Sequence, residues 1–294
     1  MKKLTLLLTA SLIIATACNK IDTSQNVFDI ISPVEVTSWD PEYAQTVIQK
    51  IYVEEFTGHT CTYCPDGARR LKAIMDEYPD VIATAIHCTD LAKPVTGDPN
   101  PFSNDYRTPM GIVICEDFKI AGIPKATINR MPVNDTEWGF GRTVWRSAIE
   151  NMGRNNVRAG IELQCTVNEI TQEIEANVAV TIIKDLPNPV QICLILQEDS
   201  VISGQLDGSS TNIVEDYVHN HMLRAGFNGN YGTKLTPNGM VAAEHKYLTS
   251  FKLSYKNSFP DSYIPVVIKN CSVVAYLIDR VTKEVIQVEY VHLQ

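Results

Sequence analysis

The hydrophobic periodicity changes once along the chain, and this change limits the folds that the sequence can adopt. Before residue 157, the apolar residues form segments typical of alternating strands and amphipathic helices. After Arg158 they alternate with polar residues, as in residues 161–167. About six strand-like segments of this kind follow without a strong helix, which predicts an antiparallel β-sandwich over residues 157–294. We therefore expect an α/β domain, residues 46–156, followed by an all-β domain.

The N-terminus has the pattern of an export signal. Two lysines precede an apolar run that ends at residue 15 and is too short to cross a hydrocarbon core of ~30 Å. The residues before Cys18 resemble a relaxed bacterial lipobox, with Ala15 where the strict pattern has Leu. This resemblance implies a signal peptide at residues 1–17, lipidation of Cys18, and an anchor and tether over residues 18–45. The alternative is an ordinary signal peptide cleaved after an Ala-x-Ala sequence, in which Cys18 has no role.

The charge of the chain argues against nucleic-acid binding, and its cysteine content bears on disulfides and zinc sites. The chain has 34 acidic and 25 basic side chains, and adjacent basic residues occur only as isolated pairs. The sequence therefore has no nucleic-acid-binding footprint. One of the eight cysteines would carry the lipid, which leaves an odd number in the mature chain. An exported protein meets an oxidising environment, which allows disulfides and makes zinc–thiolate sites less expected.

A C-x-x-C motif, Cys61-Thr62-Tyr63-Cys64, lies where a strand-like segment is followed by a helical one. Residues 47–56 have the composition of a strand, a helix is expected from Pro65 up to Pro79, and residues 81–87 resemble a buried strand. Backbone N–H groups at a helix N-terminus stabilise a thiolate, and the two-residue spacer permits a reversible disulfide. The motif in this position predicts either a dithiol that exchanges with other thiols or a permanent structural disulfide.

This arrangement resembles the thioredoxin-like superfamily. Glu55 stands six places before Cys61, as does the buried acid that accepts a proton from the second cysteine in thioredoxins. Gly122-Ile123-Pro124 resembles the turn whose cis-proline faces the dithiol. The resemblance implies that Cys61 attacks, Cys64 resolves, Glu55 transfers a proton and Pro124 presents backbone to the substrate. Thr60 stands where thioredoxins have Trp, and a Pro-rich insertion at residues 91–110 lengthens the path to Pro124.

Three segments together resemble the twenty-eight-kilodalton outer-membrane protein family of Gram-negative bacteria: VEEFTGHTCTYCPDGARR, GIPKATINR and EDYVHNHMLRAGFNGNYG. The family implies an exported, usually lipid-anchored outer-membrane protein with a thioredoxin-like domain followed by an immunoglobulin-like sandwich. It also implies that residues 217–231 form a long loop of the sandwich. The function expected is thiol–disulfide exchange on exported proteins, without a cofactor. The alternative is a surface binding or adhesion lipoprotein that contacts surface ligands through the sandwich and keeps the C-x-x-C pair as a structural disulfide.

The remaining candidate residues are cysteines and histidines outside the motif. Cys88 and Cys115 flank the insertion and are expected either to form a second disulfide or to remain as buried thiols. His87 beside Cys88 has no regular zinc-ligand spacing to the C-x-x-C motif. His219 and His221 lack a third ligand with matching spacing. We therefore expect no metal site.

Overall fold

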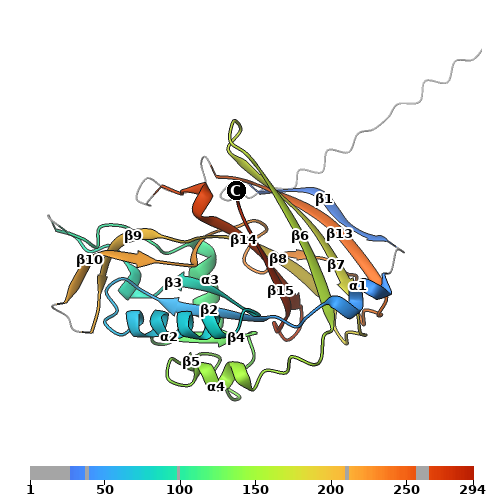
Figure 1. The fold of residues 1–294 in the computed structure, drawn as a ribbon, viewed down its shortest axis with the longest axis horizontal. Coiled ribbons are helices and arrows are strands. Elements are labelled where there is room, and N and C mark those ends of the chain that lie inside the picture. Colours follow the sequence, from blue (N-terminus) through green and yellow to red (C-terminus); the bar gives the residue numbers. More distant parts are fainter. Residues whose placement is uncertain (1–26, 37–39, 98–99, 209–211, 256–264) are drawn as a thin grey trace, which may run out of the picture.

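The computed structural model of the chain describes residues 27–36, 40–97, 100–208, 212–255 and 265–294. Its helices are α1 (Pro41–Thr46), α2 (Cys64–Glu77), α3 (Pro109–Asp117) and α4 (Trp145–Glu150), with 3₁₀ turns at Asp90–Ala92 and Ile268–Asn270. Two parts of the molecule lie side by side along the long axis (Figure 1). One, called here the helix-containing part, holds α2, α3 and α4, and the other holds β6, β7 and β13.

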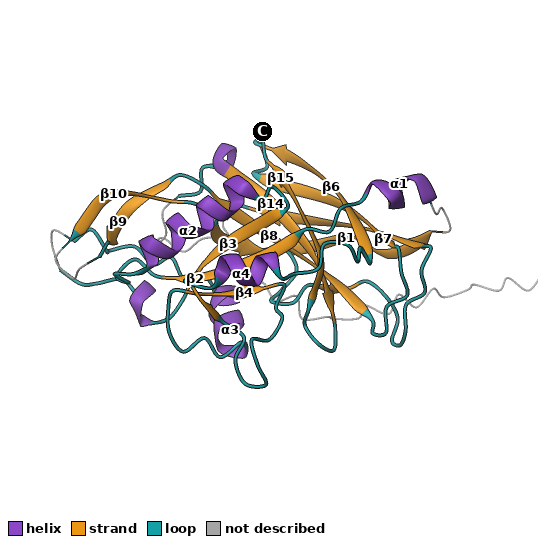
Figure 2. Ribbon diagram, turned by 60° about the horizontal axis from the view of Figure 1, so that its bottom comes forward, coloured by secondary structure: helices purple, strands orange, loops and turns teal. Residues whose placement is uncertain are grey.

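Most of the regular secondary structure in the described part of the chain is β-strand, as Figure 2 shows. One antiparallel sheet has the order β1 (Val27–Val36), β13 (His245–Ser254), β7 (Glu173–Ile182) and β6 (Ala159–Asn168). A larger mixed sheet has the order β15 (Val285–His292), β14 (Cys271–Asp279), β8 (Val190–Glu198), β11 (Met222–Gly226), β3 (Val81–His87), β2 (Ile51–Thr57), β4 (Lys125–Ile128) and β5 (Phe140–Gly141), and β12 (Thr233–Lys234) also pairs with β8. The strands β9 (Val201–Leu206) and β10 (Ile213–His219) form a separate antiparallel hairpin.

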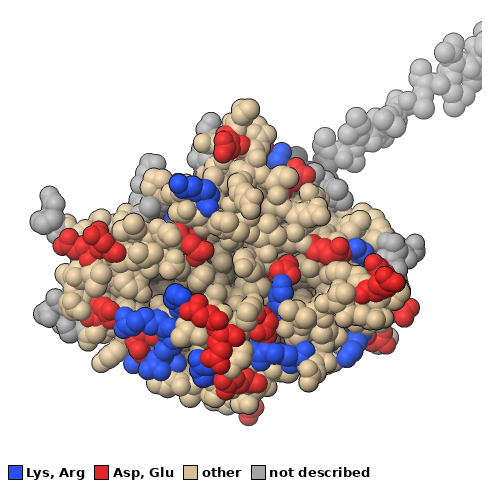
Figure 3. Space-filling model, viewed as in Figure 1, with Lys and Arg blue, Asp and Glu red and all other residues tan. Residues whose placement is uncertain are grey.

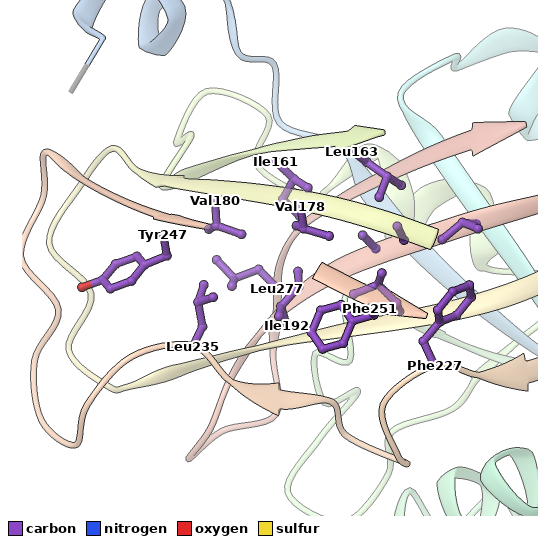
Figure 4. Close-up of a cluster of buried hydrophobic side chains, with 14 of the residues drawn as sticks. Ile161, Leu163, Val178, Val180, Ile192, Phe227, Leu235, Tyr247, Phe251 and Leu277 are labelled. Atoms are coloured by element: carbon purple, nitrogen blue, oxygen red, sulfur yellow. The ribbon is translucent and has the colours of Figure 1, made fainter. Parts of the chain in front are cut away.

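The larger sheet is buried on both faces where the two parts of the molecule meet. In β8, Ile192 and Leu194 pack into the core beneath β6, β7 and β13, whereas Cys193 and Ile195 point the other way, toward α3. The first of these cores is drawn in Figure 4, where side chains of the two facing sheets interdigitate. Because neither face of β8 or β14 meets water, both strands are buried throughout, and their central residues 192–196 and 273–278 are apolar without alternation.

In the helix-containing part, α2 and α4 cover one face of the sheet and α3 covers the other. Leu71 and Ile74 of α2 pack on Ile51 and Val53 of β2, and Trp145 of α4 completes this core. β2 and β3 are parallel, while β4 is antiparallel to β2. The face under α2 therefore carries the odd-numbered residues of β2 and β3.

The predicted strand, helix and strand around the C-x-x-C motif are confirmed as β2, α2 and β3. Two expectations were wrong. Residues 27–36, inside the expected tether 18–45, form strand β1, paired with β13. Residues 217–231 do not form one long loop of the sandwich, because β10 ends within them and β11 lies between β8 and β3.

The expected boundary at residues 156 and 157 remains a prediction. The larger sheet crosses it, since β11 pairs with β8 on one side and with β3 on the other. The two parts therefore share a sheet.

Candidate functional site

Cys61 and Cys64 form a disulfide at the start of α2, with their Cα atoms 5.4 Å apart. A short loop after β2 places Cys61 before the helix, and Cys64 is the first helical residue, followed by Pro65. Proline is favoured there because its missing N–H has no partner in the first turn. Both cysteines are buried, with 3% and 2% of their surface exposed. The pair therefore lies under other parts of the chain rather than at the surface.

Glu55 lies on the face of β2 that is turned toward α2. It is buried, its Oε1 has no hydrogen-bond partner, and burial raises its pKa to about 8. A Cβ added at Gly67, in the first turns of α2, would lie 3.1 Å from this oxygen. Glu55 is therefore a neutral acid for most molecules at pH 7, packed directly beneath the helix that begins at Cys64.

Pro124 lies against the same turn of α2. The Ile123–Pro124 peptide bond is cis, and it directly precedes β4. A Cβ at Gly67 would also lie 3.2 Å from the Cβ of Pro124. The structure thus brings the four residues singled out from the motif, Cys61, Cys64, Glu55 and Pro124, around the first turns of α2.

A cavity of about 710 Å³ lies between α2, the sheet and the β9–β10 hairpin. Its floor is formed by β2 and β3, including Glu55 and His87, and its far wall by β10. The wall on α2 begins at Cys64, whereas Cys61 is not part of the lining. Charges of both signs are interspersed over the face that carries α2 and α4 (Figure 3), and at the rim Lys72 is paired with Asp76.

Three buried histidines surround the inner end of this region. His87 has no hydrogen-bond partner on either ring nitrogen, His219 has none on Nε2, and His59 has none on Nδ1. The rings of His87 and His219 lie 5.5 Å apart, and Tyr106 contacts all three. Burial lowers the pKa of His219 to about 4 and also lowers the pKa of His87 and His59. All three imidazoles are therefore neutral at pH 7.

The β9–β10 hairpin covers the loop that carries the disulfide. The N–H of Leu206 donates to the carbonyl of His59 at 2.9 Å, and the N–H of Gly208 donates to that of Thr62 at 2.8 Å. The amide Nε2 of Gln205 donates to the carbonyl of Cys61 at 3.0 Å. These contacts bury Cys61 beneath a segment that lies more than 140 positions later in the sequence.

Arg69 of α2 also holds this hairpin, through an ion pair with Asp207 at 2.9 Å. Sequence reasoning missed the hairpin, and with it Gln205 and Tyr217 as neighbours of the site. No local sequence pattern predicts the contact of the hairpin with the disulfide loop, because the two segments lie far apart in the sequence.

The structure also brings Cys88 and Cys115 together. Their Sγ atoms are 2.8 Å apart in a buried core, and both are free thiols in this structure. Cys165, Cys193 and Cys271 are also free.

His219 lies buried over the cavity, whereas His221 pairs with Asp199. Among the residues that the structure describes, no group of three or more His, Cys, Asp or Glu side chains is arranged to hold a metal ion.

The expected lipidation site, Cys18, lies outside the described residues. Within the described part of the chain, no helix is both long and apolar enough to cross a bilayer.

Comparison with known proteins gives a family and a fold. The sequence profile of a family described as outer membrane protein Omp28 matches residues 114–294, more than half of the chain. HBP35 of Porphyromonas gingivalis superposes with a TM-score of 0.61 at 18% identity, covering 84% of this chain and 76% of that one. A domain of the outer membrane lipoprotein Omp28 from the same organism matches at 24% identity and a TM-score of 0.30, covering 47% of this chain and 89% of its own. A search of curated proteins found no match.

Proposed function

Because the chain belongs to the Omp28 family of outer membrane proteins, we propose that it is a lipid-anchored outer-membrane protein whose Cys61–Cys64 pair performs thiol–disulfide exchange on exported proteins. Cys18 would carry the lipid, and the polar residues that follow it would act as the tether. The lipid would keep the dithiol at the membrane surface, within reach of proteins that cross the envelope.

The fold that we propose is a thioredoxin-like unit joined to an immunoglobulin-like sandwich. Support for the first comes from parallel β2 and β3 with α2 between them, antiparallel β4, and the cis bond before Pro124. Support for the second comes from the antiparallel sheet of β1, β13, β7 and β6, which packs against β8 and β14.

The observation that carries the proposed chemistry is the buried Glu55, which lines the same cavity as Cys64 and whose Oε1 has no hydrogen-bond partner. In the reduced protein, the Cys61 thiolate would attack a substrate disulfide and form a mixed disulfide. Cys64 would then attack Sγ of Cys61 and release the substrate thiolate, and its own proton would pass to Glu55 in those molecules whose Glu55 carboxyl is ionised. A carboxyl with a pKa of about 8 has nearly the basicity of an ordinary thiolate, so this proton transfer is close to balanced.

Insulin reduction with dithiothreitol as the electron source tests the proposal. The wild-type protein should accelerate the precipitation of insulin chains, and Cys61→Ser should abolish the acceleration because no attacking thiol remains. Cys165→Ser, which changes a free cysteine in β6, is the matched control and should retain full activity. A wild-type rate equal to that of Cys61→Ser would contradict the proposal.

A second function is favoured by the burial of both cysteines beneath the β9–β10 hairpin. In that account the disulfide is structural, and the protein binds a surface ligand through its sandwich. Disulfides of this kind resist reduction by glutathione. The two accounts therefore differ in the reduction potential of the Cys61–Cys64 pair.

A further inference from the structure

The two sulfurs of the disulfide have different surroundings. On the side of Cys61, the hairpin closes the loop through three hydrogen bonds to the carbonyls of His59, Cys61 and Thr62. On the side of Cys64, the chain leaves a cavity of about 710 Å³ that ends against this residue. An incoming thiol therefore meets backbone at Cys61, whereas Cys64, although only 2% exposed, belongs to the lining of the cavity.

We propose that this cavity admits a low-molecular-mass thiol that reduces the disulfide by attacking Cys64. The inference rests on the proposed function and names the electron donor for the same site. A folded protein cannot enter a space of this size, which lies within the range of small-molecule sites. Electrons would enter the dithiol through the cavity, and protein substrates would reach Cys61 only when the β9–β10 hairpin is released.

The reaction balances with two molecules of the small thiol. The first, as thiolate, forms a bond to Sγ of Cys64, and the bond between the two cysteine sulfurs breaks with its electron pair on Cys61. The second thiol attacks the sulfur of the bound small molecule and forms the small disulfide, which leaves. Cys64 then holds the second pair of electrons, so two small thiols are oxidised and the protein disulfide is reduced.

The cavity also contains groups that can form hydrogen bonds with an entering thiol. Glu55 and His87 both line it, and each has a buried atom without a hydrogen-bond partner. They share the face of the sheet under α2, because Glu55 is paired with Ala85 and Thr57 with His87 in the parallel register. Buried polar atoms of this kind are stabilised when a ligand or water forms hydrogen bonds with them.

Filling the cavity tests the inference. Ala68 lies on the wall formed by α2, and Ala68→Trp would occupy the entrance. The rate at which glutathione reduces the oxidised protein should fall by about tenfold or more, because access to the disulfide limits exchange. Ala73→Trp places the same side chain on the exposed face of α2 and is the matched control, with a rate near that of wild type. Ala68→Leu should give an intermediate rate and serves if the Trp variant does not fold.

The first intermediate provides an independent readout. Rapid alkylation with iodoacetamide should show glutathione on Cys64 and the carbamidomethyl group on Cys61. Glutathione found on Cys61, or equal rates for Ala68→Trp and Ala73→Trp, would overturn the inference. Insulin reduction by the dithiothreitol-reduced protein separates the cavity route from the proposed function. If insulin is reduced while Ala68→Trp leaves the rate of reduction by glutathione unchanged, the cavity route is wrong and the proposed function stands. If insulin reduction also fails, the proposed function falls with it.

Discussion

Folding changes the protonation state of the Glu55 side chain. In water its carboxyl would be ionised at pH 7, but burial without a partner raises its pKa to about 8. The proton is therefore bound more tightly in the folded state than in the unfolded state. Any stability that depends on this proton is complete below pH 4.5 and is lost as the pH rises to about 8.

Replacement of Glu55 by Gln should remove this pH dependence. The free energy of unfolding of the wild type should fall relative to Glu55→Gln by about 1.4 kcal/mol per pH unit between pH 4.5 and 8. Urea unfolding of both proteins across this range measures the difference. Glu137→Gln, at an exposed glutamate paired with Lys125, should show no such slope, and a constant difference for Glu55→Gln would contradict the account.

Cys88 and Cys115 lead to a second prediction at this scale. Their sulfurs already lie 2.8 Å apart, so a disulfide needs little movement in an oxidising compartment. Peptide mapping of unreduced protein isolated from the cell envelope should find the two cysteines linked. Their loop of 27 positions would contribute about 3–4 kcal/mol of stability. Both cysteines alkylated without prior reduction would contradict the prediction.

At the scale of elements, local sequence patterns predict β2, α2 and β3 because each carries its own signal, a run of apolar and β-branched residues in the strands and helical spacing of apolar residues in α2. The motif also predicts that Cys61, Cys64 and Glu55 lie together, since all three belong to one continuous strand–loop–helix segment. The hairpin could not be predicted in this way. The end of β10 was expected to begin a loop, and the place of the hairpin over the disulfide depends on contacts between segments about 140 residues apart.

Release of the hairpin should expose the disulfide. The Gln205 side chain donates to the carbonyls of Gly58, Cys61 and Leu206, and its loss in Gln205→Ala removes about 1–2 kcal/mol from the closed state. We expect insulin reduction by the dithiothreitol-reduced protein, which depends on access to Cys61, to accelerate about tenfold. Gln164→Ala, at an exposed position in β6, should leave the rate unchanged. An unaltered rate in Gln205→Ala would show that the hairpin does not limit access.

At the scale of the whole molecule, the two parts are held together by a shared sheet and by the contact of a buried arginine with β14. Arg130 follows β4, has no exposed side-chain surface, and binds Glu54 of β2 at 2.5 Å. Its guanidinium also lies over the ring of Tyr276 in β14, 5.2 Å from the centroid. Sequence periodicity indicated two separate units, and it could not show this joint because β8 and β14 contribute to cores on both sides.

Replacement of Arg130 should destabilise both parts of the molecule together. Arg130→Met leaves the Glu54 carboxylate buried without its partner, at a cost of about 3–5 kcal/mol. Thermal unfolding should show a lower midpoint in a single transition, because the shared sheet couples the two parts. Arg146→Met breaks an exposed pair with Glu77 and should cost less than about 1 kcal/mol. Equal effects of the two variants would contradict this role.

The reduction potential of the Cys61–Cys64 pair tests the central claim most directly. Equilibration of the full chain in glutathione redox buffers, followed by alkylation and mass spectrometry, gives the fraction of the disulfide at each ratio. The exchange account predicts a potential above about −300 mV, so that both forms are populated in these buffers. A pair that stays fully oxidised, with a potential below about −300 mV, would contradict it and identify the disulfide as structural.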